Sequence, residues 1–176
     1  NFGKNEDFSI YYKKMGRLLS SSAININIRI IYDYLSELYP KEEYRENFPT
    51  LEDSIEMLFK NKFSSEEKTN IINTFAFHEL GFIPQEYAEA LFKLNKYFIL
   101  SVVIDIWAPK TMWIDTFEKH NINQLFKASS FSSDCKMVKP SPKPFLSVVE
   151  QLNISKEECL IIGDSVRRDL GGALNA

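Results

Sequence analysis

The stretch Tyr97-Phe-Ile-Leu-Ser-Val-Val-Ile104 is a nearly continuous apolar run that ends at Asp105. Such runs are typical of parallel strands that helices cover on both faces. Downstream, the hydrophobic pattern predicts further strands at residues 125–130 and 159–162. Helices are expected between and after these strands, at residues 110–120, 141–152 and 165–176. This alternation predicts an α/β fold with a three-layer parallel sheet core.

Upstream of this core the pattern is helical. From Ile24 to Ile30 isoleucines alternate with polar residues, which alone would indicate a strand. The steps of three and four from Ile24 through Ile28 and Ile31 to Leu38 instead predict one face of a helix, and this stripe is the longer one. Two capping-box-like starts, at residues 50–53 and 64–67, predict further helices. We therefore expect a helical domain at residues 1–82 and an α/β core at residues 83–176.

Composition excludes several classes of protein. The 176 residues carry a net charge of −3, which argues against a nucleic-acid binder. No apolar run reaches the roughly 18 residues of a membrane span, so no membrane partner is expected. The two cysteines, Cys135 and Cys159, cannot build a disulfide framework and fit a reducing compartment, which favours a cytoplasmic location. The sequence alone leaves the oligomeric state undetermined.

Two acidic residues follow the last predicted strand, in Leu160-Ile-Ile-Gly-Asp-Ser-Val-Arg-Arg-Asp169. The strand would deliver Asp164 to the carboxyl edge of the sheet, where open α/β folds bind ligands. Two neighbouring carboxylates there suit Mg²⁺, an oxygen-seeking cation. The alternative is that Asp164 is only an N-cap and Asp169 a first-turn acid. Arg167 and Arg168 are interpreted as a solvated helix face, with a contact to substrate or to the helical domain as the alternative.

A lysine lies in a proline-rich segment before the predicted helix at 141–152. Pro140 and Pro142 restrict the backbone around Lys139, and Ser141 can begin the helix. A lysine held in this way can reach a phosphate as a point charge. The alternative is a solvated lysine in a turn.

Together these features resemble the haloacid dehalogenase-like hydrolase superfamily. Its third motif is a Lys often followed by Pro and a helix, here Lys139-Pro140, and its fourth is Gly-Asp-x-x-x-x-Asp after a strand, here Gly163 to Asp169. The resemblance covers roughly residues 82–176. The helical residues 5–80 stand where many members insert a helical cap. The resemblance implies a Rossmann-like core with a cap of the subclass I type.

The resemblance also implies an activity, that of a Mg²⁺-dependent phosphatase acting on a small phosphorylated metabolite through an aspartyl-phosphate intermediate. Asp164 and Asp169 would lie at the metal, and Asp169 would orient Lys139. Lys139 would contact the substrate and neutralise the transferring phosphoryl group. Ile104 and Asp105 stand at the phosphate-binding second motif, where the family has Ser or Thr. Ile104 has no hydroxyl to offer.

The family nucleophile, the first Asp of an Asp-x-Asp motif, has no match in these 176 residues. The simplest interpretation is that they begin after that motif, so that the core lacks its first strand and C-terminal part and is inactive alone. In this family the first strand lies between the strands expected here at 97–104 and 159–162. We therefore expect either another segment in that place or a poorly ordered sheet.

Three alternatives differ in function class. A degenerate member that binds a phosphorylated ligand or a protein partner without catalysis is favoured by Ile104 and by the unmatched nucleophile. A 2-haloacid dehalogenase would use the same nucleophile without a metal, and the Gly-Asp…Asp pair favours the metal-dependent branch. A receiver-type signalling domain also places acids and a Lys on a parallel sheet, but the helical insert and the motif order argue against it.

Overall fold

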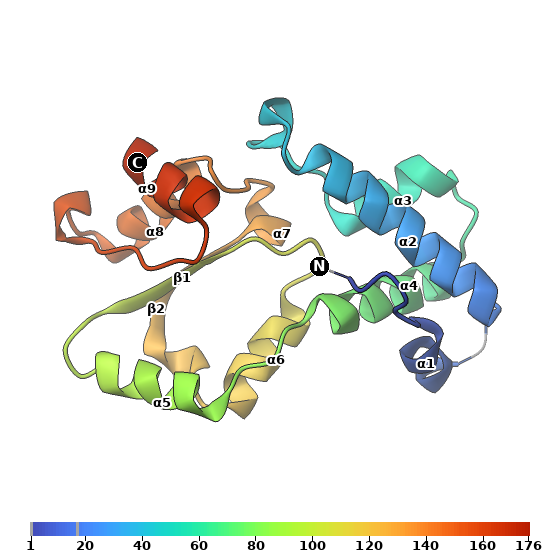
Figure 1. Cartoon of the computed structure of the whole chain (residues 1–176), viewed down its shortest axis with the longest axis horizontal. Helices are drawn as coiled ribbons and strands as arrows, with labels where there is room; N and C mark the ends of the chain where they lie inside the picture. Colours follow the sequence, from blue (N-terminus) through green and yellow to red (C-terminus); the bar gives the residue numbers. More distant parts are fainter. Residues whose placement is uncertain (1, 17) are drawn as a thin grey trace.

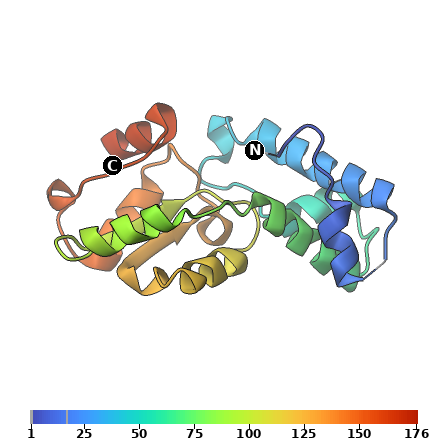
Figure 2. The same ribbon diagram turned by 60° about the horizontal axis from the view of Figure 1, so that its bottom comes forward.

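The computed structural model describes residues 2–16 and 18–176, which form a helical part and an α/β part side by side (Figures 1 and 2). The helical part holds α1 (Ser9–Tyr12), α2 (Ser21–Leu38), α3 (Leu51–Phe59) and α4 (Ser65–Glu79). The α/β part holds α5 (Gln85–Leu94), β1 (Leu100–Ile104), α6 (Thr111–Lys119), β2 (Phe126–Phe131), α7 (Ser132–Cys135) and α8 (Lys143–Leu152), then a π-helix (Val166–Leu170) and α9 (Gly171–Asn175). Within these residues no helix combines the length and apolarity needed to cross a membrane.

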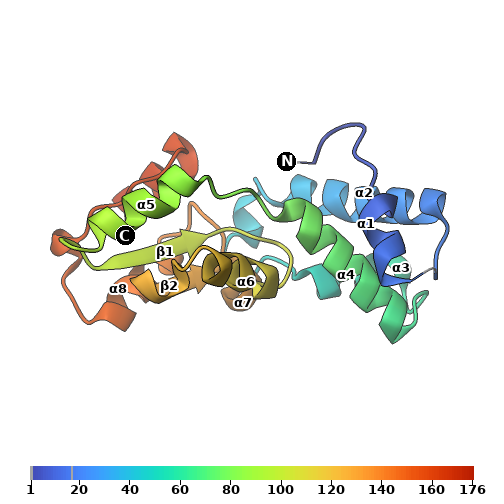
Figure 3. The ribbon, with the colours of Figure 1, turned by 90° about the horizontal axis from the view of Figure 1, so that it is seen from below.

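The sheet is parallel and has helices on both faces. β1 pairs with β2 in parallel, and the pairing ends with Ile104 opposite Phe131. One face packs on a cluster that includes Ala88 of α5 and Phe117 of α6. α8 lies on the opposite side of the sheet from α5 (Figures 1 and 3). The predicted three-layer arrangement with a parallel sheet is therefore confirmed.

The predicted third strand at residues 159–162 is wrong. These residues form no strand, and Leu160 and Ile162 are 83% and 84% exposed. An apolar run becomes a strand only where a neighbour pairs with its backbone, and among the described residues β1 pairs with β2 alone. The first strand is also shorter than the apolar run, because Tyr97 lies in a turn and is 81% exposed.

The competing strand and helix patterns of the N-terminal part resolve as a helix. Ile24, Ile28 and Ile31 are fully buried in α2, whereas Ile26 and Ile30, which belong only to the alternating pattern, are 55% and 40% exposed. Ser20 caps the helix by accepting a hydrogen bond from Ala23 N at 3.2 Å. The predicted capping boxes also form at the starts of α3 and α4. The helical pattern prevails over the alternating one because it lets the helix bury one continuous apolar face.

Residues of the α/β part pack with the core of the helical part. Trp107 follows β1 by three residues, yet its ring lies among four aromatic rings of the helical part at centroid distances of 5.6 to 6.4 Å, those of Tyr32, Tyr39, Phe48 and Phe75. Ala108 and Val138, also from the α/β part, are fully buried in the same cluster. The two parts therefore share a hydrophobic core at the carboxyl end of β1.

Candidate functional site

The candidate site is centred on an ion pair. Lys139 Nζ lies 2.6 Å from Asp169 Oδ1, and both side chains are largely buried. The same ammonium donates to Val103 O of β1 at 3.5 Å. The close approach of Lys139 to one of the two motif acids, expected from the convergence of strand ends, is therefore present. The assignment of catalytic roles to these residues stays a prediction.

Asp169 is held on both of its oxygens. Oδ1 accepts from Lys139, and Oδ2 accepts from the backbone N of Ser165 at 2.9 Å. Burial would raise the pKa of Asp169, but the Lys139 ammonium and the Ser165 N–H outweigh it and hold this pKa below its usual value. Asp169 is therefore an ionised positioning group for Lys139.

The side chain of Asp169 fits there because residue 163 is a glycine. A Cβ at Gly163 would lie 2.4 Å from Asp169 Cγ and 2.5 Å from Asp169 Cβ. Any larger residue would push Asp169 away from Lys139. This contact gives a structural reason for the glycine that precedes Asp164 in the fourth motif.

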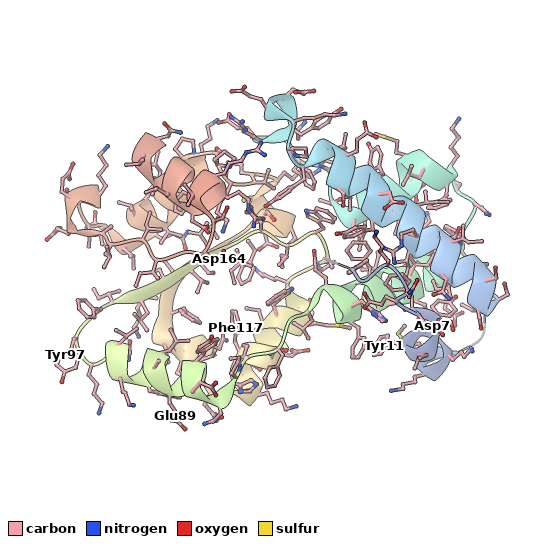
Figure 4. The ribbon with its side chains drawn as sticks, in the orientation of Figure 1. Asp7, Tyr11, Glu89, Tyr97, Phe117 and Asp164 are labelled. Atoms are coloured by element: carbon pink, nitrogen blue, oxygen red, sulfur yellow. The ribbon has the colours of Figure 1, made fainter. Side chains whose placement is uncertain are left out.

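Asp164, the other acid of the fourth motif, is exposed and differs from Asp169 in its contacts. It lies in the loop that leads into the π-helix, where Figure 4 labels it, and its side chain is exposed. Within residues 2–16 and 18–176 it makes no hydrogen bond or ion pair, and no cluster of three or more His, Cys, Asp or Glu residues there could hold a metal. Asp164 does not pair with Lys139, so of the two predicted metal ligands it alone has uncommitted oxygens.

Asp105 joins the two parts of the protein. Its carboxylate accepts from the backbone N of Lys139 at 3.1 Å and from the Tyr39 hydroxyl at 2.5 Å. Burial raises the pKa of Asp105, although Tyr39 and Lys139 oppose this rise. Burial and the adjacent carboxylate also raise the pKa of Tyr39, so its hydroxyl stays protonated and donates. Asp105 thereby fixes the backbone from which Lys139 projects.

Ile104 lies where sequence analysis placed the second motif, but it contributes only packing. Its side chain packs on the apolar cluster that contains Ile106 and Phe117. The hydroxyl that follows β2, that of Ser132, is engaged in hydrogen bonds with the backbone of Ile106 at 2.7 and 2.8 Å. Neither residue offers a free hydroxyl at the end of β1.

The sequence did not point to two residues of the site, Tyr39 and Pro40. Tyr39 follows α2, and its hydroxyl accepts from Arg168 Nη1 at 3.1 Å. Arg167 Nη2 donates to Pro40 O at 3.0 Å. The alternative of a contact with the helical part therefore holds for both arginines, although Arg167 is also exposed to solvent. The Tyr39-Pro40 dipeptide marks the end of α2 in the sequence, but no local signal brings it to Asp105, 66 residues away.

Comparison with known proteins identifies the family. The profile of haloacid dehalogenase-like hydrolases matches residues 21–176, which is most of the chain. The chain belongs to the haloacid dehalogenase-like hydrolase family. A relative from Xenopus laevis, named phospholysine phosphohistidine inorganic pyrophosphate phosphatase, is 40% identical over 58 residues. That match spans 31% of this chain and only 22% of the relative's length.

Solved structures support the haloacid dehalogenase-like fold. The HAD-hydrolase YfnB of Bacillus subtilis, determined bound to magnesium, aligns with a TM-score of 0.56 at 17% identity, over 96% of this chain and 74% of that one. A HAD phosphatase from Thermococcus onnurineus aligns with a TM-score of 0.51 at 19% identity, over 95% and 72%. At these identities the similarity concerns the fold.

A buried acid ties the β1 loop of this haloacid dehalogenase-like chain to its helical part. Glu79, the last residue of α4, accepts from the backbone N of Trp107 at 2.7 Å and of Ala108 at 3.0 Å. Burial raises the pKa of Glu79 to about 7, although the two N–H donors lower it. The unfolded chain ionises this group near pH 4.5.

Stability is therefore expected to depend on pH through Glu79. Because its folded pKa is raised, its contribution is complete below pH 4.5 and is lost as the pH rises through 7, by about 3 kcal/mol. Urea unfolding between pH 4 and 8 would measure this loss. In Glu79→Gln the loss should largely disappear, whereas Glu89→Gln, an exposed control on α5 (Figure 4), should retain it. Equal slopes in all three proteins would contradict the assignment.

Proposed function

We propose that this chain forms the cap and core portion of a Mg²⁺-dependent phosphohydrolase that acts on a small phosphorylated metabolite through an aspartyl-phosphate intermediate. The observation that carries the proposal is the buried Lys139–Asp169 ion pair at the carboxyl end of β1, beside the free carboxylate of Asp164. The phosphatase names of the Xenopus relative and of the Thermococcus structure support phosphoryl transfer rather than dehalogenation.

Each residue has a distinct task in this proposal. Lys139 supplies a fixed positive charge for the phosphoryl oxygens. Asp169 holds the ammonium, and Asp105 holds the backbone N–H of the same lysine. Tyr39 brings the helical cap onto this site through its hydrogen bond to Asp105. The cap therefore contacts the core directly at the proposed site.

Of the two acids in the fourth motif, Asp164 has the free carboxylate oxygens that suit Mg²⁺. Asp164 would hold the ion, since Mg²⁺ in phosphoryl-transfer sites commonly takes one or two carboxylates together with substrate oxygens and water. Asp169 has both oxygens committed to Lys139 and Ser165. When bound, Mg²⁺ supplies charge neutralisation and polarisation at the phosphoryl group. The magnesium-bound Bacillus subtilis structure supports this choice of metal.

A second candidate function is phosphate binding without turnover. Residues 1–176 contain no Asp-x-Asp, and Ile104 packs into the core and provides no hydroxyl. On either proposal, these residues alone should not hydrolyse p-nitrophenyl phosphate with Mg²⁺, because the assisting groups act only on a nucleophile. Turnover by residues 1–176 that a substitution within them abolishes would show that their nucleophile has been overlooked.

Binding of orthophosphate, followed by calorimetry with and without Mg²⁺, tests the proposed site. Mg²⁺ should tighten orthophosphate binding. In Asp164→Asn the affinity for orthophosphate in the presence of Mg²⁺ should be roughly tenfold lower than in wild type, the size typical of a lost charge-assisted contact. Lys139→Met should weaken binding in both conditions. Asp115→Asn, an exposed acid of α6, is the charge-matched control and should behave as wild type. Orthophosphate binding that none of these changes affects would refute the site.

A further inference from the structure

A cavity extends from Lys139 toward the helical cap. Its volume is about 170 Å³, several times the ~30 Å³ that one water molecule occupies in the liquid. It lies between the end of α2 and the start of the π-helix, and its charged lining residues are Lys139, Arg167 and Arg168. Among the described residues that line it there is no Asp or Glu. Because Lys139 is paired with Asp169, the cavity presents two unpaired cations, Arg167 and Arg168, next to the proposed phosphoryl site.

The arginines are fixed but keep free donors. Arg168 donates its Nε to Ser165 Oγ at 3.3 Å and its Nη1 to the Tyr39 hydroxyl at 3.1 Å, and its guanidinium lies 5.7 Å from the centre of the Tyr39 ring. Arg167 uses its Nη2 on Pro40 O. Among the described residues, Arg168 Nη2 and the Nε and Nη1 of Arg167 have no hydrogen-bond acceptor. Guanidinium groups placed in this way recognise carboxylate or phosphate oxygens.

The neighbouring acids Asp105 and Asp169 attract Arg168 electrostatically, but within the described residues neither forms a hydrogen bond or ion pair with Arg167 or Arg168. Asp169 is paired with Lys139, and Asp105 accepts from Tyr39 and from the Lys139 backbone. Neither acid lines the cavity or bonds to Arg167. Arg167 is exposed and Arg168 partly exposed, so water can serve their remaining donors, and an anion would replace that water with charge-assisted hydrogen bonds. The complementary occupant is an anion.

We propose that the substrate carries a second anionic group, a phosphate or a carboxylate, which binds in this cavity against Arg167 and Arg168. This inference rests on the proposed function, because the first group is the phosphoryl group at Lys139. The cavity needs Tyr39 and Pro40 of the helical cap as well as the π-helix of the core. The cap therefore contributes to substrate selection by completing the second anion site.

Calorimetry with three probes tests the proposal on residues 1–176. Methylenediphosphonate and phosphonoacetate each carry two anionic groups, and orthophosphate carries one. At least one two-group probe should bind about tenfold more tightly than orthophosphate, and its identity separates a phosphate from a carboxylate preference. Arg167→Gln should remove most of that advantage and change orthophosphate binding by less than about twofold. Arg168→Gln should also remove most of the advantage, and it should lower orthophosphate affinity as well because Arg168 donates to Tyr39, the partner of Asp105.

A control variant tests whether a loss of binding comes from this site or only from the removal of a positive charge. Arg29→Gln removes an arginine of α2 that donates to Gly3 O and lies over the Phe8 ring, and it should preserve the two-group advantage. The inference is overturned if neither two-group probe exceeds orthophosphate, or if Arg167→Gln, whose side chain is exposed and should not impair folding, leaves the advantage intact. Failure of all three probes to bind would instead refute the proposed phosphoryl site itself.

Discussion

Replacing Trp107 with Ala is expected to lower the free energy of unfolding by about 3 kcal/mol, the lower end of the usual cost of removing a large aromatic side chain from a core, because the ring is only partly buried. The ring belongs to the loop after β1 but packs against the core of the helical cap, next to Phe48 and Phe75. The substitution should also weaken orthophosphate binding, because the loop that carries Trp107 also carries Asp105. Urea unfolding and calorimetry measure the two effects.

Two further variants serve as controls for the Trp107→Ala prediction. Tyr97→Ala removes an aromatic ring that is 81% exposed and should change the free energy of unfolding by less than about 0.5 kcal/mol. Trp107→Phe keeps much of the packing and should fall between the two. If Trp107→Ala costs no more than Tyr97→Ala, the shared core between cap and α/β part does not hold them together.

Gly163→Ala is expected to disrupt the site through a single methyl group. The added Cβ would lie 2.4 Å from Asp169 Cγ and 2.5 Å from its Cβ, so the backbone or the π-helix must shift. Overpacking of this kind costs about 1–3 kcal/mol. With Asp169 displaced, Lys139 loses its partner, and orthophosphate affinity should fall by about tenfold or more. Unfolding in urea and calorimetry would show both losses.

Gly81→Ala is the matched control. No atom of the described residues lies within 4 Å of a Cβ built at Gly81, so the methyl group has free space. This variant should keep wild-type orthophosphate binding and unfold at a similar urea concentration. Wild-type behaviour of Gly163→Ala would mean that Asp169 does not need the position it has against Gly163.

The features that sequence alone predicted are those encoded locally or by a repeated period. The Ile24–Leu38 stripe specified α2 because burial of one face needs only the spacing within that segment. The approach of Lys139 to Asp169 was also predicted, and the ion pair is present. The convergence of strand ends, from which it was expected, does not apply to Asp169, because residues 159–162 form no strand and the loop after them brings Asp169 to Lys139.

The features that were missed depend on partners far along the chain. Residues 159–162 have strand composition, but composition does not supply the neighbouring backbone that a strand requires. Tyr39 and Arg168 are ordinary in sequence and gain their role only when α2 ends beside the π-helix. Such contacts arise from tertiary packing, which a single sequence does not display.

The one-sided pairing of β1 has a consequence for amide hydrogen exchange. In a strand, successive residues direct their N–H groups to opposite sides, so a strand with one neighbour protects only alternate amides. In the described part of the chain β1 has β2 as its single partner. Slow and fast exchange should therefore alternate residue by residue from Ser101 to Ile104, where the register with β2 is regular. That alternation would give way to uniform protection as soon as a second strand paired with the open edge.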